Sequence, residues 1–95
     1  MENKIVWITG ASSGLGEALA LECAKSKVKL VLSARRDAEL QRVKTECAKF
    51  ISAENILTLP LDVTDLSRVD AEVEKVIQKF GRIDILINNA GVVQR

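Results

Sequence analysis

The chain has 95 residues, so it can form one small domain and no more. Its 14 basic and 13 acidic residues nearly balance, and no basic run is longer than Arg35 and Arg36, which excludes a nucleic-acid partner. No apolar run approaches the length of a membrane span, and the first predicted strand begins too early to leave room for a signal peptide. These features predict a soluble globular protein of cytoplasmic composition.

The amino-terminal third of the chain predicts a strand, a helix and a second strand. Residues 4–9 and residues 28–33 are apolar runs, as expected of strands that are buried on both faces. Between them, residues 15–26 carry apolar side chains at helical spacing. The face of this helix that is predicted to be buried carries Leu15, Leu19 and Cys23.

The middle of the chain predicts a second helix and a third strand. Residues 37–52 have helical periodicity, and Asp37 is placed to cap the helix start. The apolar face of this helix carries Leu40, Val43, Cys47, Phe50 and Ile51. Residues 56–61 then predict a short strand that ends in a proline and a leucine.

The last part of the chain predicts a third helix over residues 66–80 and a fourth strand over residues 83–88. Asp65 is placed to cap the start of this helix, and Gly81 is placed to end it. Its apolar face carries Leu66, Val69, Val73, Val76, Ile77 and Phe80.

The alternation of strands and helices predicts a three-layer α/β fold. Nearly continuous apolar strands argue for a parallel sheet that is covered on both faces. Right-handed crossovers then favour the strand order 3-2-1-4, with a switch point between the first and fourth strands. Because ligands bind at the carboxyl ends of strands beside such a point, the loop after residue 9 and the segment 88–91 are expected to share one crevice.

Several single residues are assigned to structure rather than to function. Cys23 and Cys47 lack metal-ligand spacing and lie on apolar helix stripes, which predicts buried, reduced thiols and no metal site. Trp7 lies in the middle of the first strand and is predicted to be core. Arg82 and Asp84 are predicted to form a surface pair.

The loop after the first strand carries three glycines before a helix, which is the context of a dinucleotide-binding turn. Gly10 allows the sharp turn, Gly14 lets a pyrophosphate approach the backbone, and Gly16 permits close helix packing. Ser12 and Ser13 can add hydroxyl donors, and the helix amino end offers N–H groups to phosphates. The alternative is a glycine-rich turn without a ligand. No Lys-Ser or Lys-Thr pair follows Gly16, which excludes a P-loop.

Three motifs at their mutual spacing resemble the classical short-chain dehydrogenase/reductase family. They are Thr9-Gly10-Ala11-Ser12-Ser13-Gly14-Leu15-Gly16, Asp62-Val63, and Asn88-Asn89-Ala90-Gly91. The resemblance covers the whole chain and implies a Rossmann-like fold. It implies cofactor-binding roles for Gly10, Ser12, Ser13, Gly14, Leu15, Gly16, Asp62, Val63, Asn89, Ala90 and Gly91.

The resemblance also implies what two of these motifs contact. Asp62 would hydrogen-bond the adenine ring beside the Val63 backbone, and the segment from Asn88 to Gly91 would line the cofactor ribose and support the sheet. The alternatives are that Asp62 caps the next helix and that the two asparagines form an ordinary turn.

The end of the second strand predicts the choice of cofactor. An NAD-binding protein places an acidic residue here for the ribose 2′-hydroxyl, whereas this chain has Ser33, Ala34, Arg35 and Arg36. A guanidinium grips a 2′-phosphate, so NADP(H) is predicted, with Arg35 as the main clamp and Ser33 and Arg36 assisting. The alternative is a solvated pair of charges.

The resemblance implies an oxidoreductase that moves a hydride between NADP(H) and a small-molecule carbonyl or alcohol. The family's catalytic residues are a Tyr-x-x-x-Lys pair with a supporting Ser and Asn, and none of them has a counterpart in residues 1–95. The chain contains no tyrosine, so no catalytic residue is assigned. The chain is therefore expected to be the amino-terminal portion of one NADP(H)-binding domain and to be inactive alone. The alternatives are a non-catalytic nucleotide-binding module and an inert fragment.

The sequence allows alternatives for the cellular location and the oligomeric state of the protein. The composition of the chain predicts a soluble, cytoplasmic protein, whereas the resemblance implies an amino-terminal membrane segment and association with the endoplasmic reticulum membrane for full-length relatives. Homo-oligomer formation by the full-length protein is a further open alternative.

Overall fold

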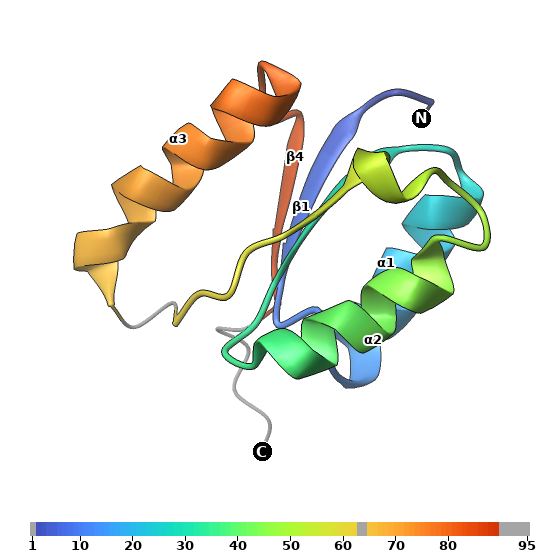
Figure 1. Ribbon diagram of the computed structural model, residues 1–95, viewed down its shortest axis with the longest axis horizontal. Coiled ribbons are helices and arrows are strands. Elements are labelled where there is room, and N and C mark those ends of the chain that lie inside the picture. The colour runs from blue at the N-terminus through green and yellow to red at the C-terminus, as the bar shows by residue number, and fades with distance from the viewer. Residues whose placement is uncertain (1, 63–64, 90–95) are drawn as a thin grey trace.

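The computed structural model describes residues 2–62 and 65–89. Its elements are β1 (Ile5–Thr9), α1 (Gly14–Lys25), β2 (Lys29–Ser33), α2 (Asp37–Cys47), β3 (Ile56–Thr58), α3 (Val69–Phe80) and β4 (Ile85–Asn88). The four strands form one parallel sheet in the order β3-β2-β1-β4, which confirms the predicted strand order. Helices α1 and α2 lie on one side of the sheet and α3 lies on the other, so the molecule has three layers (Figure 1).

The sheet is held together by its two central strands. All five residues of β1 are buried, and four of the five residues of β2 are buried. Their register pairs Ile5 with Lys29 and Thr9 with Ser33, so β1 and β2 end at the same level of the sheet. This common end is where the glycine-rich loop leaves β1.

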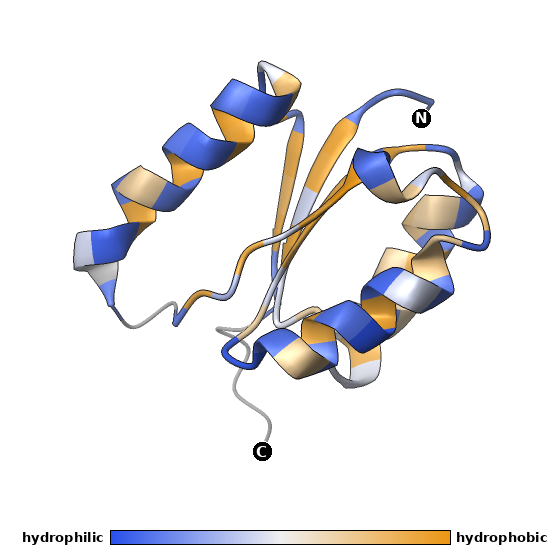
Figure 2. Ribbon diagram, viewed as in Figure 1, coloured by the Kyte–Doolittle hydropathy of each residue, from blue (hydrophilic) through white to orange (hydrophobic). Residues whose placement is uncertain are grey.

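Two clusters of buried apolar residues lie on the two faces of the sheet. The ribbon coloured by hydropathy shows strands that are mostly hydrophobic and helices that alternate hydrophilic and hydrophobic residues (Figure 2). Strand residues Val6, Ile8, Leu30 and Leu32 pack toward α1 and α2. Trp7 and Val31 belong to the second core cluster, on the α3 side, and Trp7 is buried as predicted. The residues of the α3-side cluster are Ile5, Trp7, Val31, Leu59, Leu61 and Val76.

The buried face of α1 differs from the prediction. Its fully buried residues are Gly16, Ala20 and Ala24, whereas Leu15 is 64% exposed. The predicted buried face was therefore wrong by one position along the helix. The small residues face the sheet because their short side chains let α1 approach it closely. Leu19 and Cys23 flank the small-residue stripe and are partly buried against the core.

Helix α2 buries three of its predicted face residues, Leu40, Val43 and Cys47, but it ends at Cys47 rather than at residue 52. The chain then turns, with hydrogen bonds from the Phe50 and Ile51 N–H groups back to the Cys47 carbonyl, and Phe50 is exposed. Asp37 is the first residue of the helix, and no side-chain cap bond is formed there. The predicted cap was therefore wrong, because the helix begins one residue earlier than a capping Asp37 requires.

Strand β3 is shorter than predicted, although its hydrogen bonding continues beyond Thr58. Leu59 N–H donates to the Leu32 carbonyl, and Leu61 N–H donates to the Ala34 carbonyl. Pro60 stands between these two donors and has no N–H, but this position points away from β2 toward the open edge of the sheet, so the ladder loses no bond. The extended chain therefore still reaches the sheet end at Leu61.

Helix α3 ends at Phe80 as predicted, but the α-helix begins at Val69 rather than at residue 66. The Asp65 carboxylate accepts hydrogen bonds from the Ser67 N–H (3.2 Å) and the Ser67 hydroxyl (2.6 Å), so Asp65 caps a 3-10 turn over Leu66–Arg68 that leads into α3. Gly81 ends the helix in the left-handed conformation with φ 85°, and its N–H donates to the Ile77 carbonyl. Gly81 is therefore confirmed as the end of the helix, whereas Asp65 caps the 3-10 turn before α3, and the N-cap of α3 itself is Arg68, which forms no side-chain cap bond.

The two cysteines differ in their burial. Cys47 is buried and burial raises its thiol pKa to about 11, whereas Cys23 is only partly buried, with its thiol pKa also raised by burial. Both are free thiols. Among the described residues, no helix is both long enough and apolar enough to cross a membrane.

Asp84 joins the start of β4 to the start of β1. Its Oδ2 atom accepts a hydrogen bond from the Ile5 N–H (2.8 Å) and pairs with Arg82 Nε (2.9 Å), which confirms the predicted pair. The Ile5 N–H, followed by Arg82, holds the pKa of this carboxyl below its ordinary value of 3.8. Asp84 therefore stabilises the folded state when it is ionised.

This linkage predicts a pH-dependent stability. A carboxyl with a depressed folded pKa contributes stability above its unfolded pKa and loses that contribution as pH falls through the folded value. Asp84→Asn should therefore lower the urea midpoint at about pH 7, and the gap from wild type should shrink below about pH 4. Urea titrations at several pH values check this. A gap that stays constant from neutral to acid pH would contradict the role of the ionised carboxylate.

Candidate nucleotide-binding site

The glycine-rich loop leaves β1 at the level where β2 ends. Gly10 has φ 64° and Gly14 has φ 50°, conformations that favour glycine, so the chain turns sharply twice before α1. Ala11 N–H donates to the Ser33 carbonyl (3.0 Å), which ties this loop to the end of β2. The loop is thereby fixed at the carboxyl edge of the sheet, as predicted.

The amino end of α1 offers unpaired donors. In the part of the chain that the structure describes, the N–H groups of Ser13, Gly14 and Leu15 donate to no protein acceptor, and the Ser13 side chain makes no cap bond. A Cβ on Gly14 would meet no atom within 4 Å, so the space beside this backbone is open. Exposed N–H groups at a helix amino end attract anions, because the helix dipole adds to their partial charge.

Gly16 faces inward, unlike Gly14. A Cβ at Gly16 would overlap the Gly10 carbonyl oxygen and would lie 2.9 Å from Asn89 Nδ2. The missing side chain therefore lets α1 start directly against the loop and the end of β4.

The end of β4 meets the glycine loop, as the switch-point argument predicted. Asn89 Nδ2 donates to the Gly10 carbonyl (3.2 Å), and the Thr9 hydroxyl donates to Asn88 Oδ1 (2.9 Å). Thr9 and Asn88 also line a cavity of about 230 Å³ between the sheet and α3. The two most unusual segments of the sequence are thus joined by direct hydrogen bonds.

The three residues predicted to bind a 2′-phosphate differ in their surroundings. Arg35 and Arg36 are exposed just beyond β2, and the Arg36 carbonyl accepts the first bond of α2 from Leu40 N–H. Ser33 is fully buried, and its hydroxyl oxygen accepts a hydrogen bond from the Trp7 indole N–H (2.8 Å). Successive side chains of β2 point to opposite faces of the sheet, and Ser33 points to the face where Trp7 is buried. Ser33 is therefore kept away from the surface where the two arginines lie.

Arg35 and Asp62 are neighbours, although they are far apart in the sequence. Arg35 Nε lies 3.9 Å from Asp62 Oδ1, and both side chains are largely exposed. The Asp62 carbonyl accepts the Asp65 N–H, and the Asp65 side chain accepts the Ser67 N–H in the turn that leads into α3. Of the other predicted site residues, Val63, Ala90 and Gly91 lie outside the described residues.

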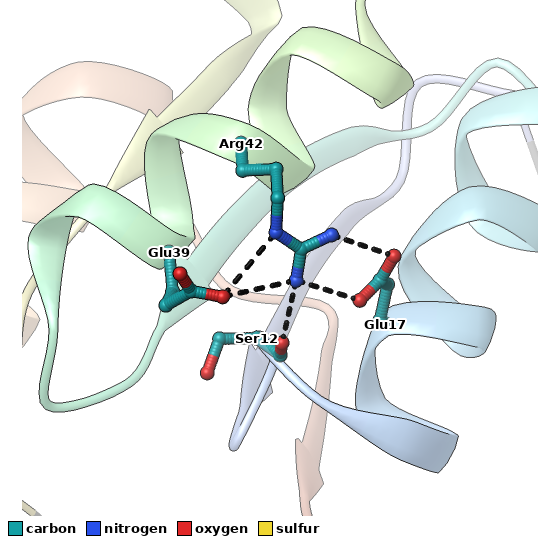
Figure 3. A network of polar contacts seen from close by, with 4 residues as sticks. All are labelled: Ser12, Glu17, Glu39 and Arg42. Atoms are coloured by element: carbon teal, nitrogen blue, oxygen red, sulfur yellow. Dashed lines mark hydrogen bonds and ion pairs between the residues drawn. The ribbon is translucent and has the colours of Figure 1, made fainter.

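Sequence reasoning missed Arg42. Its guanidinium reaches from α2 to Glu17 on α1, to Glu39 on its own helix and to the Ser12 carbonyl in the glycine loop (Figure 3). Hydrogen bonding to Arg42 is the main cause that holds the pKa of the Glu17 carboxyl below its ordinary value. The spacing of Glu39 and Arg42 predicts their contact within one helix, but no local pattern predicts contacts to Glu17 and Ser12.

The family follows from comparison with known proteins. A model of the short chain dehydrogenases matches residues 4–95. The chain belongs to this family. Within this family, the sequence motifs also predict a resemblance to dehydrogenase/reductase family member 7. The Homo sapiens protein "Dehydrogenase/reductase SDR family member 7" is 52% identical to this chain over 97 residues. That match covers 100% of this chain and 29% of the relative, so the chain spans less than a third of the relative's length.

Solved structures of the family share this fold. An L-sorbose reductase from Gluconobacter frateurii, complexed with NADPH and L-sorbose, is 38% identical with a TM-score of 0.88 over 99% of this chain and 35% of that chain. A 3-ketoacyl-(acyl-carrier-protein) reductase from Brucella melitensis, complexed with NADH, is 39% identical with a TM-score of 0.78 over 90% of this chain and 33% of that chain. The short-chain dehydrogenase fold is therefore found with either nicotinamide cofactor.

Proposed function

We propose that this chain is the NADP(H)-binding part of a short-chain oxidoreductase that transfers a hydride between NADP(H) and a small-molecule carbonyl or alcohol. Residues 1–95 then form the amino-terminal portion of one nucleotide-binding domain. The observation that carries the proposal is the end of β2, where exposed Arg35 and Arg36 stand beside an open glycine loop and no carboxylate occupies the position that reads a ribose 2′-hydroxyl.

The glycine loop fits the pyrophosphate of a dinucleotide. Backbone donors at Ser13, Gly14 and Leu15 face open space, with the hydroxyls of Ser12 and Ser13 close by in the chain. The nicotinamide of the bound cofactor supplies the hydride chemistry. The chain's own contribution in this proposal is to bind and orient the cofactor.

Further residues are proposed to complete the cofactor site. Asp62 with the Val63 backbone would hold the adenine ring, and Asn89, Ala90 and Gly91 would line the ribose. Asp62 lies on the same edge as Arg35, and Asn89 contacts the glycine loop, which supports one continuous site.

Arg35 is the residue proposed to select NADP(H) over NAD(H). Its ion pair with Asp62 is long, at 3.9 Å, and its side chain is 76% exposed, so the pair contributes little stability. A 2′-phosphate carries more charge than one carboxylate and matches the guanidinium geometry. Arg35 can therefore turn from Asp62 to a phosphate at small cost, with Arg36 adding positive charge nearby. Because relatives bind NADPH or NADH, this site rather than family membership argues for NADP(H).

The proposal predicts a change of cofactor preference. Arg35→Asp should lower NADPH affinity about tenfold or more and change NADH affinity much less, because only NADPH presents a 2′-phosphate. Fluorescence titration of the protein at its natural length with both nucleotides measures the two dissociation constants.

A matched control makes the same charge change elsewhere. Lys49 is an exposed residue that follows the carboxyl end of α2 and forms an ion pair with Glu46. It lies about 16 Å along the helix axis from the start of α2, so Lys49→Asp should leave both affinities unchanged. Equal losses of NADPH and NADH affinity in Arg35→Asp would defeat the 2′-phosphate role.

The alternative of a non-catalytic nucleotide-binding module differs in a measurable way. The intact mass of the endogenous protein establishes its natural length, and a carbonyl-reduction assay at that length establishes turnover. A species near 10.4 kDa that binds NADPH without turnover would favour the module. A much heavier species with turnover would favour the reductase.

A further inference from the structure

Arg42 connects three parts of the chain through one planar group. Its Nη1 and Nη2 atoms donate to the two oxygens of Glu17 (3.1 and 3.0 Å), a bidentate contact with the first turn of α1. Nη2 also donates to the Ser12 carbonyl (3.0 Å), and Nε donates to Glu39 (3.3 Å). Figure 3 shows the guanidinium between these acceptors, so α2, α1 and the glycine loop are fixed by a single side chain.

The contact with Ser12 orients a peptide group of the proposed phosphate site. In a trans peptide, the carbonyl of one residue and the N–H of the next point in opposite directions. Because the Ser12 carbonyl points to Arg42, the Ser13 N–H points away from Arg42. That N–H has no protein acceptor among the described residues, which leaves it available to an anion.

The contact with Glu17 removes an unfavourable charge. Glu17 lies in the first turn of α1, beside the N–H groups that would bind phosphate, and an unpaired carboxylate there would repel the ligand. The ion pair at 3.0 Å offsets this charge, and the Glu17 side chain is only 27% exposed, so water screens it incompletely. Without Arg42, the Glu17 carboxylate beside the loop would be uncompensated, and Glu39 would lose its ion pair.

We propose that Arg42 is a positioning residue for cofactor binding: it holds the Ser12–Ser13 peptide in the anion-binding orientation and neutralises Glu17. This inference rests on the proposed nucleotide-binding function. Arg42 itself contacts carboxylates and a carbonyl, so its effect on phosphate is indirect. It should therefore influence the pyrophosphate, which NADPH and NADH share, whereas Arg35 influences the 2′-phosphate.

The test compares nucleotide affinities of Arg42→Gln with those of wild type, at a temperature where both are folded. We expect NADPH and NADH affinities to fall by the same factor, about tenfold, because charge-assisted contacts of this kind are lost. In the double variant Glu17→Gln/Arg42→Gln, part of the affinity should return, since the uncompensated carboxylate is gone. Lys49→Gln is the matched control, because it removes a cation from an ion pair with Glu46 and should change neither affinity.

Three outcomes would overturn the inference. If Arg42→Gln lowers only the melting temperature, Arg42 has a purely structural role. If NADPH affinity falls and NADH affinity does not, Arg42 acts at the 2′-phosphate instead. If wild-type protein binds neither nucleotide, the proposed function fails and this inference fails with it. Should Arg42→Gln not fold, Arg42→Lys replaces it, and a several-fold equal loss is expected because an ammonium cannot reach all three acceptors.

Discussion

Gly16→Ala should lower the free energy of unfolding by about 3 kcal/mol or more, because overpacking against backbone cannot relax through a rotamer change. The new Cβ would overlap the Gly10 carbonyl oxygen and lie 2.8 Å from the Gly10 carbonyl carbon. It would also press on Asn89 Nδ2 at 2.9 Å, the atom that donates to that carbonyl. Chemical denaturation of the variant, followed by circular dichroism, measures the loss.

Gly81→Ala is the control for this prediction. Gly81 has φ 85°, but a Cβ added there would meet no atom within 4 Å, so alanine brings backbone strain without a clash. Its expected cost is about 1 kcal/mol. Gly16 is not among the glycines with a positive φ, so alanine brings no left-handed strain there, and equal costs for the two substitutions would mean that close packing at Gly16 is not what the fold requires.

The sequence predicts the sheet and the meeting of its two loops because both follow from local signals. Apolar runs mark the strands, and right-handed crossovers then leave few strand orders for four strands. Gly10 and Gly14 are recognisable because a left-handed conformation demands glycine. The bond from Asn89 to Gly10 follows from this topology, since both strand ends meet at the switch point.

What the sequence does not predict depends on contacts between elements. The buried stripe of α1 follows its small residues rather than its larger ones, because closeness to the sheet outweighs side-chain size. In the sequence, Arg42 does not differ from the other charged residues of its helix. Its contacts with Glu17 and the Ser12 carbonyl arise only when α2 packs beside α1 and the glycine loop. Ser33 follows a strand and precedes two arginines, so a pattern groups it with them, although the sheet turns its side chain toward Trp7.

Ser33→Ala should therefore lower the free energy of unfolding by about 2 kcal/mol and leave the ratio of NADPH to NADH affinity unchanged. The Trp7 indole N–H is buried and donates to the Ser33 hydroxyl at 2.8 Å, so alanine would leave this donor without its acceptor. A buried donor that loses its partner costs more than the bond itself contributes. Thermal denaturation and paired nucleotide titrations measure the two expected results.

A double-mutant cycle separates this structural role from a role at the cofactor. Trp7→Phe removes the donor, so Ser33→Ala should cost about 1 kcal/mol less in that background than in the wild type. A shift of the nucleotide ratio in Ser33→Ala, with no coupling to Trp7, would instead return Ser33 to the 2′-phosphate site. The fully buried position of Ser33 favours the first result, because a side chain with no exposed surface cannot meet a phosphate while β1 and β2 stay paired. In the proposed function, Arg35 and Arg36 would then hold the 2′-phosphate of NADP(H) without Ser33.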